Sequence, residues 1–228
     1  MSKHIFVIGA SRGIGAELVR AYAQNPDHQV YAFARNIDLM EATFHQENVH
    51  CFSLDLSENV EGQFAQMIDQ LPQVDVLIEN AGYLVNKPFP ELTHVDISTS
   101  YQINIIGVME SIQCLLPKMN PAGAHIVNIS SMGGFQGSMK FAGLSAYSTS
   151  KAALCSFTEL FAEEYKETNI KMNCLCLGAV QTEMLEQAFP GYQAPLNPIQ
   201  MAEFITDFSL NAQRYLNGKI IPVSLTNP

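Results

Sequence analysis

Two side chains that could move a proton stand four residues apart, Tyr147 and Lys151. A tyrosine phenol ionises at a pH of about 10, so it needs a stabilised anion to exchange a proton at neutral pH. A lysine ammonium one helical turn away lowers the pKa of the phenol by stabilising the phenolate. Ser130 and Ser131 precede the pair and offer a hydroxyl to a substrate oxygen. The combination is suited to the chemistry of a carbonyl or an alcohol.

The Tyr-x-x-x-Lys spacing occurs three times in the chain, and one occurrence is predicted to be helical. The pairs at positions 83 and 87 and at 215 and 219 lie beside Pro88 and Gly218, which disfavour a helix. From residue 146 to residue 167, apolar residues recur at three- and four-residue steps without glycine or proline, as in an amphipathic helix. Residues four apart share a helix face, so Tyr147 and Lys151 are predicted to be neighbours.

A glycine-rich segment follows the first apolar run directly. It reads Gly9-Ala10-Ser11-Arg12-Gly13-Ile14-Gly15 and joins a predicted strand to a predicted helix. Backbone N–H groups and the positive end of a helix can bind a pyrophosphate at such a junction. The spacing differs from the commonest dinucleotide fingerprint, and the glycines could instead serve only a tight turn. Followed by the Tyr/Lys pair, the segment indicates nicotinamide-dependent redox chemistry.

Two arginines favour NADP over NAD as the cofactor. Arg35 follows the second predicted strand and Arg12 lies in the glycine segment, and a guanidinium matches the 2′-phosphate of NADP in charge and geometry. Both could instead be solvated surface charges, and Asp38 could still bind the ribose of NAD. The next two strand ends are followed by Asp55-Leu56 and Asn80-Ala81-Gly82. Their side chains could bind adenine or only order their own turns.

Composition indicates a soluble globular protein with one domain, residues 1–228. A net charge of −10 without a basic cluster argues against binding nucleic acid or anionic lipid. No apolar run reaches the roughly 18 residues of a membrane span. Five cysteines without a Cys-x-x-Cys pair indicate reduced thiols and a cytoplasmic location. Six scattered histidines without ligand spacing predict no metal site.

Short apolar runs alternate with longer amphipathic segments along the chain. The predicted strands are residues 5–9, 29–34, 49–54, 74–78, 124–129, 171–177 and 219–223. The predicted helices are residues 14–24, 60–70, 95–119, 146–167 and 198–215, with a shorter one at 38–45. Strands separated by helices imply an α/β fold with a doubly wound parallel sheet of seven strands, covered by helices on both faces. In such sheets, ligands bind beyond the carboxyl ends of the strands.

These motifs, in their order, make the chain resemble the short-chain dehydrogenase/reductases across nearly its whole length. They are Gly9-x-x-x-Gly13-x-Gly15, Asp55, Asn80-Ala81-Gly82, Asn104, Ile129-Ser130-Ser131, Tyr147-x-x-x-Lys151 and residues 173–182. The resemblance implies a Rossmann-like fold and a catalytic tetrad of Asn104, Ser131, Tyr147 and Lys151. It also implies a cofactor site that includes Asn80, Gly178, Val180 and Thr182, with Tyr147 and Lys151 beside the nicotinamide. Length and layout are similar to the small C-factor-like and carbonyl-reductase-like members.

Three features bear on the substrate side of the predicted site. Residues 133–143 form an inserted loop whose Phe135, Met139 and Phe141 either contact substrate or pack on the core. The apolar segment at residues 184–192 favours an uncharged or partly apolar substrate, unless it only covers the core. Leu177-Gly178 stands where Pro-Gly is usual in the family, which predicts a less rigid loop.

The resemblance implies an NADP(H)-dependent oxidoreductase that interconverts an aldehyde or ketone and an alcohol, with Tyr147 as the general acid/base and without a metal. In this scheme Ser131 holds the substrate oxygen, Lys151 binds the ribose, and the amide of Asn104 holds a water on the proton path. The helices at 95–119 and 146–167 predict a homodimer or homotetramer. A non-catalytic cofactor sensor, or an epimerase or dehydratase with a retained cofactor, could use the same fold.

Overall fold

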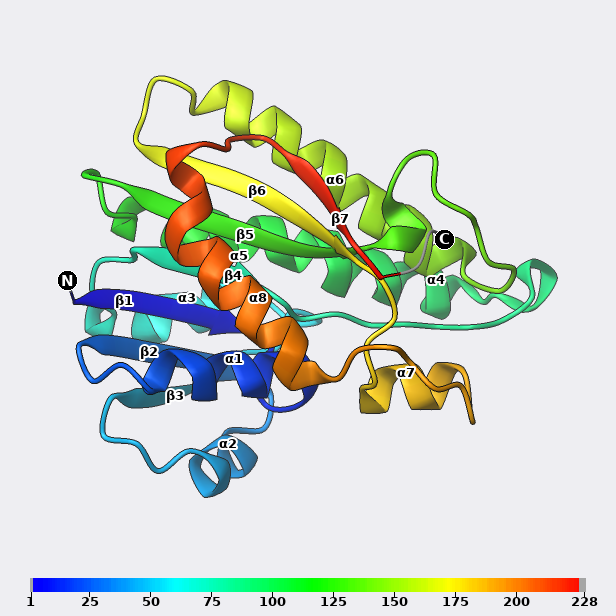
Figure 1. Ribbon diagram of the computed structural model, residues 1–228, viewed down its shortest axis with the longest axis horizontal. Coiled ribbons are helices and arrows are strands. Elements are labelled where there is room, and N and C mark those ends of the chain that lie inside the picture. The colour runs from blue at the N-terminus through cyan, green and yellow to red at the C-terminus, as the bar shows by residue number, and fades with distance from the viewer. Residues whose placement is uncertain (1, 226–228) are drawn as a thin grey trace.

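A seven-stranded parallel sheet organises the computed structural model, which describes residues 2–225. The strands lie in the order β3-β2-β1-β4-β5-β6-β7 (Figure 1). Their bounds are β1 Lys3–Ile8, β2 His28–Ala34, β3 Val49–Ser53, β4 Val76–Glu79, β5 Ala124–Ser131, β6 Ile170–Leu177 and β7 Ile220–Val223. The predicted seven-stranded, doubly wound fold is confirmed.

Helices cover both faces of the sheet (Figure 1). One face carries α1 (Gly13–Ala23), α2 (Ile37–Thr43) and α8 (Pro198–Asn211), and the other carries α3 (Val60–Met67), α5 (Gly107–Leu115) and α6 (Ser145–Glu164). Two shorter helices are α4 (His94–Tyr101) and α7 (Glu183–Ala188). Short 3₁₀ turns span Ile68–Gln70, Phe89–Glu91, Leu116–Lys118, Met132–Gly134 and Ala212–Arg214. No helix within residues 2–225 has the length and apolar character needed to cross a bilayer.

The prediction of a single continuous helix at residues 95–119 is wrong, because the helix is interrupted. A π-helical segment, Gln102–Ile106, separates α4 from α5. Such bulges carry a cost within an α-helix and are frequent at functional sites. A second difference concerns α7, because the sequence analysis left open whether residues 184–192 line the substrate site or only form a helix that covers the core. The helix starts after Thr182, whose hydroxyl oxygen accepts from the Leu185 N–H at 3.2 Å, and it buries none of its residues.

Near-continuous apolar runs in the central strands bury side chains on both faces of the sheet, as expected for a parallel sheet. Along β1, for example, Ile5 and Val7 join the core under α1 and α8, whereas Phe6 and Ile8 join the core under α3, α5 and α6. The chain leaves β1 toward β2 and β3 and later returns to the other side of β1 with β4. The carboxyl ends of β1 and β4 therefore flank the switch point at which such folds bind ligands.

A buried histidine ties three elements together away from the switch point. His125 on β5 lies within 2.8 Å of the Ser209 carbonyl oxygen of α8 through Nδ1, and Nε2 lies 3.0 Å from the Asn173 amide nitrogen on β6. Because the amide donates to Nε2, the imidazole is neutral with its proton on Nδ1. Burial lowers the pKa of His125 to about 4.

We expect the free energy of unfolding to fall as the pH drops from about 6.5 to about 4, by up to about 3 kcal/mol. In this range the unfolded chain protonates its histidine and the native protein does not, so acid favours the unfolded state. Urea unfolding across this range should lose that component in His125→Gln and keep it in the control His45→Gln, in which the histidine is exposed. An unchanged pH dependence in His125→Gln would contradict the assignment.

Candidate active site

The glycine segment after β1 is built on backbone approaches that leave no space for a side chain. A Cβ on Gly9 would lie 2.6 Å from the backbone of Ala81, and Gly9 has a φ of +86°. A Cβ on Gly15 would lie 2.0 Å from the Gly9 carbonyl oxygen and 2.6 Å from Nδ2 of Asn80. The Asn80 amide donates to that same carbonyl oxygen at 2.9 Å. The segment is thus held in a fixed shape with the start of α1 facing the cleft.

A cleft of about 1160 Å³ runs along the carboxyl ends of the strands. It brings together most of the residues predicted from the sequence to bind cofactor or act in catalysis. These are Gly9, Ser11, Arg12, Gly13, Ile14, Arg35, Asp55, Leu56, Asn80, Ala81, Gly82, Ser131, Tyr147, Lys151, Gly178, Val180 and Thr182. Gly15 and Asn104 are the exceptions: Gly15 lies behind the glycine loop, and Asn104 is fully buried in the π-helical segment.

Tyr147 and Ser131 form the centre of the cleft. Tyr147 lies in the first turn of α6, Ser131 ends β5, and both line the cleft. Burial raises the pKa of Tyr147, and the Ser131 hydroxyl opposes that rise without cancelling it. The lowering of this pKa by Lys151 together with the positive nicotinamide of the oxidised complex stays a prediction for that complex; in the protein alone, desolvation of the phenolate outweighs the other effects.

Lys151 lies one turn further along α6, at the floor of the cleft. Its ammonium donates to the Ile129 carbonyl oxygen at 2.8 Å, and the residue is only 4% exposed. Burial lowers the pKa of Lys151 to about 8. The Ser130 hydroxyl donates to the Lys151 carbonyl oxygen at 2.8 Å, so α6 is fastened to β5 where the two reactive side chains lie. The pairs at 83/87 and 215/219 lie outside helices, as predicted.

The Asn104 amide makes three hydrogen bonds within the protein. Its Oδ1 accepts from the Tyr83 N–H at 2.8 Å, while Nδ2 donates to the Tyr83 carbonyl oxygen at 2.8 Å and to the Ser150 hydroxyl at 2.9 Å. Both N–H bonds are used within the protein, so the amide holds the segment after Asn80-Ala81-Gly82 against α6. The π-helical bulge brings the residue to this position.

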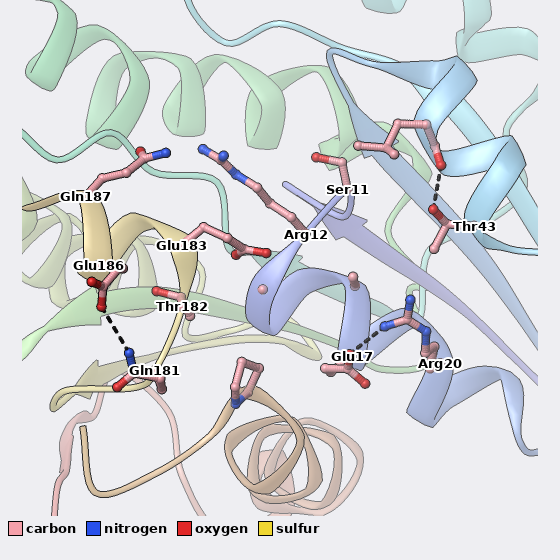
Figure 2. A pocket seen from close by; sticks show the side chains of 14 residues that line it. Ser11, Arg12, Glu17, Arg20, Thr43, Gln181, Thr182, Glu183, Glu186 and Gln187 are labelled. Atoms are coloured by element: carbon pink, nitrogen blue, oxygen red, sulfur yellow. Dashed lines mark hydrogen bonds and ion pairs between the residues drawn. The ribbon is translucent and has the colours of Figure 1, made fainter. Parts of the chain in front are cut away.

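Two exposed arginines flank the glycine loop on the cofactor side. Arg12 and Arg35 both line the cleft, and neither forms an ion pair with a described residue. Figure 2 shows a smaller adjoining cavity of about 730 Å³, where Arg12 extends beside Ser11 and the carboxylate of Glu183 is directed toward the start of α1. Arg12 and Arg35 lie at this mouth of the cleft. A phosphate bound there would meet two guanidinium groups that form no ion pair with a described residue.

The neighbouring predicted residues combine structural and lining roles. Asp55 lines the cleft while its Oδ1 accepts from the backbone and hydroxyl of Ser57 at 2.9 and 2.6 Å, so it orders its own turn. Gly178, expected in a less rigid loop, donates its N–H to the Val223 carbonyl oxygen at 2.9 Å. A tertiary hydrogen bond thus restrains the segment in which the family usually has a proline.

Apolar side chains form the wall opposite the glycine loop. Met139 and Phe141 line the cleft from the loop at 133–143, and Met184 and Phe189 line it from the α7 region. Phe135 instead packs on the core beside Met132. The sequence analysis missed the part of the wall at residues 83–87, because nothing periodic marks this segment.

The missed segment is braced on both sides. Asn86 donates to the Ala188 carbonyl oxygen at 2.9 Å, and the Lys87 N–H donates to the Gly143 carbonyl oxygen at 3.0 Å. The Lys87 ammonium also binds both carboxylate oxygens of Asp96 at 2.9 and 2.8 Å. These hydrogen bonds hold the pKa of the Asp96 carboxyl low, at about 2. The wall is therefore fixed to the inserted loop, to α4 and to the end of α7.

Three thiols lie behind Lys151, a grouping that the sequence analysis did not predict. The Cys155 Sγ lies 3.5 Å from that of Cys176 and 3.9 Å from that of Cys174. Within residues 2–225 they are the one group of side chains close enough to share a metal ion. They pack with Met132 in the apolar core, and all five cysteines are free.

Comparisons with known proteins agree with this architecture. The family model described as short chain dehydrogenase matches residues 3–193. Carbonyl reductase family member 4 of Xenopus laevis is 31% identical over 188 residues, which cover 81% of this chain and 78% of that protein. Its counterpart from Xenopus tropicalis is 29% identical over 98% of this chain and 97% of that protein.

Solved structures give the same result. A short-chain dehydrogenase from Shigella flexneri 2a strain 301, crystallised in complex with NADP, superposes with a TM-score of 0.86 at 26% identity, over 96% of both chains. The family match, the sheet order and the cleft at its switch point lead to one conclusion. The chain belongs to the short-chain dehydrogenase/reductase family of oxidoreductases.

Proposed function

We propose that the protein is an NADP(H)-dependent oxidoreductase that interconverts an aldehyde or ketone with an alcohol. The observation that carries the proposal is a single cleft that joins the glycine segment to Ser131, Tyr147 and Lys151. Gly9 allows the loop after β1 to pack on Ala81, and the start of α1 beside this loop could bind a pyrophosphate. The nicotinamide, when bound, supplies or accepts the hydride.

The protein's own residues would handle the proton and the substrate oxygen. Because burial raises the pKa of Tyr147, the phenol is protonated at neutral pH and can donate to the developing alkoxide in the reductive direction. Ser131, which lines the same cleft as the phenol, would hold the substrate oxygen beside it. Lys151 would add positive charge behind the phenol and bind the ribose, and Asn104 would keep the backbone at Tyr83 in place for both.

The wall opposite the cofactor indicates the class of substrate. Met139 and Phe141 are 59% and 51% exposed, and both line the cleft with Met184 and Phe189. Lys87 and Asp96 in this wall already form an ion pair with each other. We therefore infer an uncharged, partly apolar carbonyl compound as substrate, since exposed apolar side chains form much of this wall.

Replacing Tyr147 by Phe tests the assignment of the acid/base. Turnover should fall by about 10²- to 10⁴-fold, while NADPH binding, followed by fluorescence titration, should survive. The assay is the decrease in reduced-nicotinamide absorbance over a panel of charged and apolar carbonyl compounds. The control is Tyr215→Phe, a second Tyr-x-x-x-Lys tyrosine that is 85% exposed.

Comparable turnover in Tyr147→Phe would exclude the proposed acid/base role. Tight NADPH binding without turnover of any compound by the wild type would instead favour a non-catalytic sensor of the cofactor. A preference for charged compounds would contradict the inferred substrate class.

Replacing Arg35 by Asp tests the choice of cofactor. A guanidinium bound to a phosphate contributes about 1.5 to 3 kcal/mol, so NADPH binding should weaken at least about tenfold, and NADH binding should change much less. Fluorescence titration with both dinucleotides measures the ratio. Arg214→Asp is the control, because it introduces the same charge change at an exposed site outside the cleft. An unchanged preference in Arg35→Asp would remove the argument for NADP from this arginine.

A homodimer formed through α4, α5 and α6 is the assembly we infer. Exposed apolar side chains lie on these helices: Val95 is 68%, Met109 38% and Leu160 67% exposed. Leu160→Glu should shift the protein toward the monomer in sedimentation equilibrium, because a charge would then be buried at the contact. Ile199→Glu on α8, at 56% exposure, should not. A wild type that sediments as a monomer would contradict the inference.

A further inference from the structure

A buried glutamate directly precedes Asn80-Ala81-Gly82, and the proposed reaction gives it no role. Glu79 ends β4 next to Asn80 and is only 1% exposed. Its Oε1 accepts from the Ser111 hydroxyl on α5 at 2.5 Å. Its Oε2 is buried without a hydrogen-bond partner among the described residues. A buried carboxylate oxygen without a donor is costly, so the second oxygen needs an explanation.

The neighbouring strand holds a second oxygen of the same kind. Asn128 on β5 pairs in register with Glu79, so the two side chains leave the same face of the sheet side by side. Its Nδ2 donates to the Thr158 hydroxyl at 2.9 Å and to the Met172 sulfur at 3.3 Å. Its Oδ1 is buried without a donor from any residue between 2 and 225. These two neighbouring oxygens both lack a hydrogen-bond donor. One added proton satisfies both, because the protonated oxygen donates and the other oxygen accepts.

We propose that Glu79 is a neutral carboxylic acid whose Oε2–H donates to the Asn128 Oδ1, and that it acts as a positioning residue for Lys151. The Ser111 hydroxyl keeps donating to Oε1, so every polar atom of both side chains has a partner. An ionised Glu79 would require the Asn128 amide to be turned over. The amide oxygen would then face the Met172 sulfur in place of an N–H.

The surroundings of the carboxyl favour the neutral form. Lys151 on α6 is the charged group that acts on it, α5 presents Ser111, β5 presents Asn128 and β1 presents Ile8. The thiols of Cys155, Cys174 and Cys176 act on Lys151. Burial raises the pKa of Glu79 to about 8, more than Lys151 and Ser111 lower it.

The neutral acid matters because it presents no negative charge to Lys151. A buried carboxylate would pair with the Lys151 ammonium and draw its charge into the sheet. As an acid, Glu79 leaves the ammonium on the Ile129 carbonyl oxygen at the floor of the cleft. Above a pH of about 8 the acid ionises and then supports the lysine charge, so the two groups titrate together. The effect of this coupling on catalysis rests on the proposed function. The protonation state of Glu79 is independent of it.

The first experiment reads the protonation state of Glu79 directly. Infrared spectra of protein with ¹³C-labelled glutamate should contain one carboxylic-acid C=O band at pH 7, which disappears as the pH rises through about 8. Glu79→Gln should lack the band. The control Glu159→Gln should keep it, because Glu159 is exposed on α6, a helix that covers the same face of the sheet. Only carboxylate bands at pH 7 in the wild type would overturn the proposal, and this reading does not require any variant to fold.

The second experiment reads the effect on Lys151 without an activity assay. NMR of ¹³Cε-labelled lysine, with the Lys151 signal assigned by its loss in Lys151→Met, should give a lower titration midpoint in Glu79→Gln than in wild type. The amide cannot ionise and so cannot support the ammonium at high pH. An unchanged Lys151 midpoint in Glu79→Gln would contradict the positioning role, even if Glu79 is neutral. Because neither measurement uses turnover, a protein that failed every carbonyl assay would contradict the proposed function and leave this inference intact.

Discussion

The contact between the loop after β1 and the loop after β4 is the constraint on which the rest of the site depends. Gly9 and Ala81 are so close that a Cβ on Gly9 would lie 2.6 Å from the Ala81 backbone. The Asn80 amide closes the contact by donating to the Gly9 carbonyl oxygen at 2.9 Å. With the two loops fixed to each other, the amino end of α1 faces the cleft that β4 and β5 border. A cofactor site and a reactive site can then share one cavity.

A second set of contacts fixes α6 against the sheet. Ser130 binds the Lys151 carbonyl oxygen, the Lys151 ammonium binds the Ile129 carbonyl oxygen, and Asn104 binds Ser150 from the other side. Each of these partners is a backbone carbonyl or a neighbour of a reactive residue. Tyr147 is therefore placed by the helix that carries it, with its side chain lining the cleft. Such support allows reactive groups to be held in place without strain in their own side chains.

Electrostatics in this protein depend on burial more than on surface charge. The chain carries a formal charge of −10, yet the cleft mouth presents Arg12 and Arg35 without ion-pair partners among the described residues. Inside, burial raises the pKa of Tyr147 and of Glu79 and lowers that of Lys151. The site thus contains acids that keep their protons and a lysine that gives up its proton more readily than an exposed one. All three shifts have one cause, the loss of water around a charge.

The sequence by itself determined the strand and helix order, the glycine segment and the helical Tyr147–Lys151 pair, because each is written in local periodicity or fixed spacing. It did not reveal the break at Gln102–Ile106, the bonds of Asn104 to Tyr83, the wall at 83–87 or the grouping of Cys155 with Cys174 and Cys176. It also did not reveal that burial raises the pKa of Tyr147 in the protein alone. Only the tertiary structure decided these features, because each depends on contacts between segments far apart in the chain and on how much water their packing excludes.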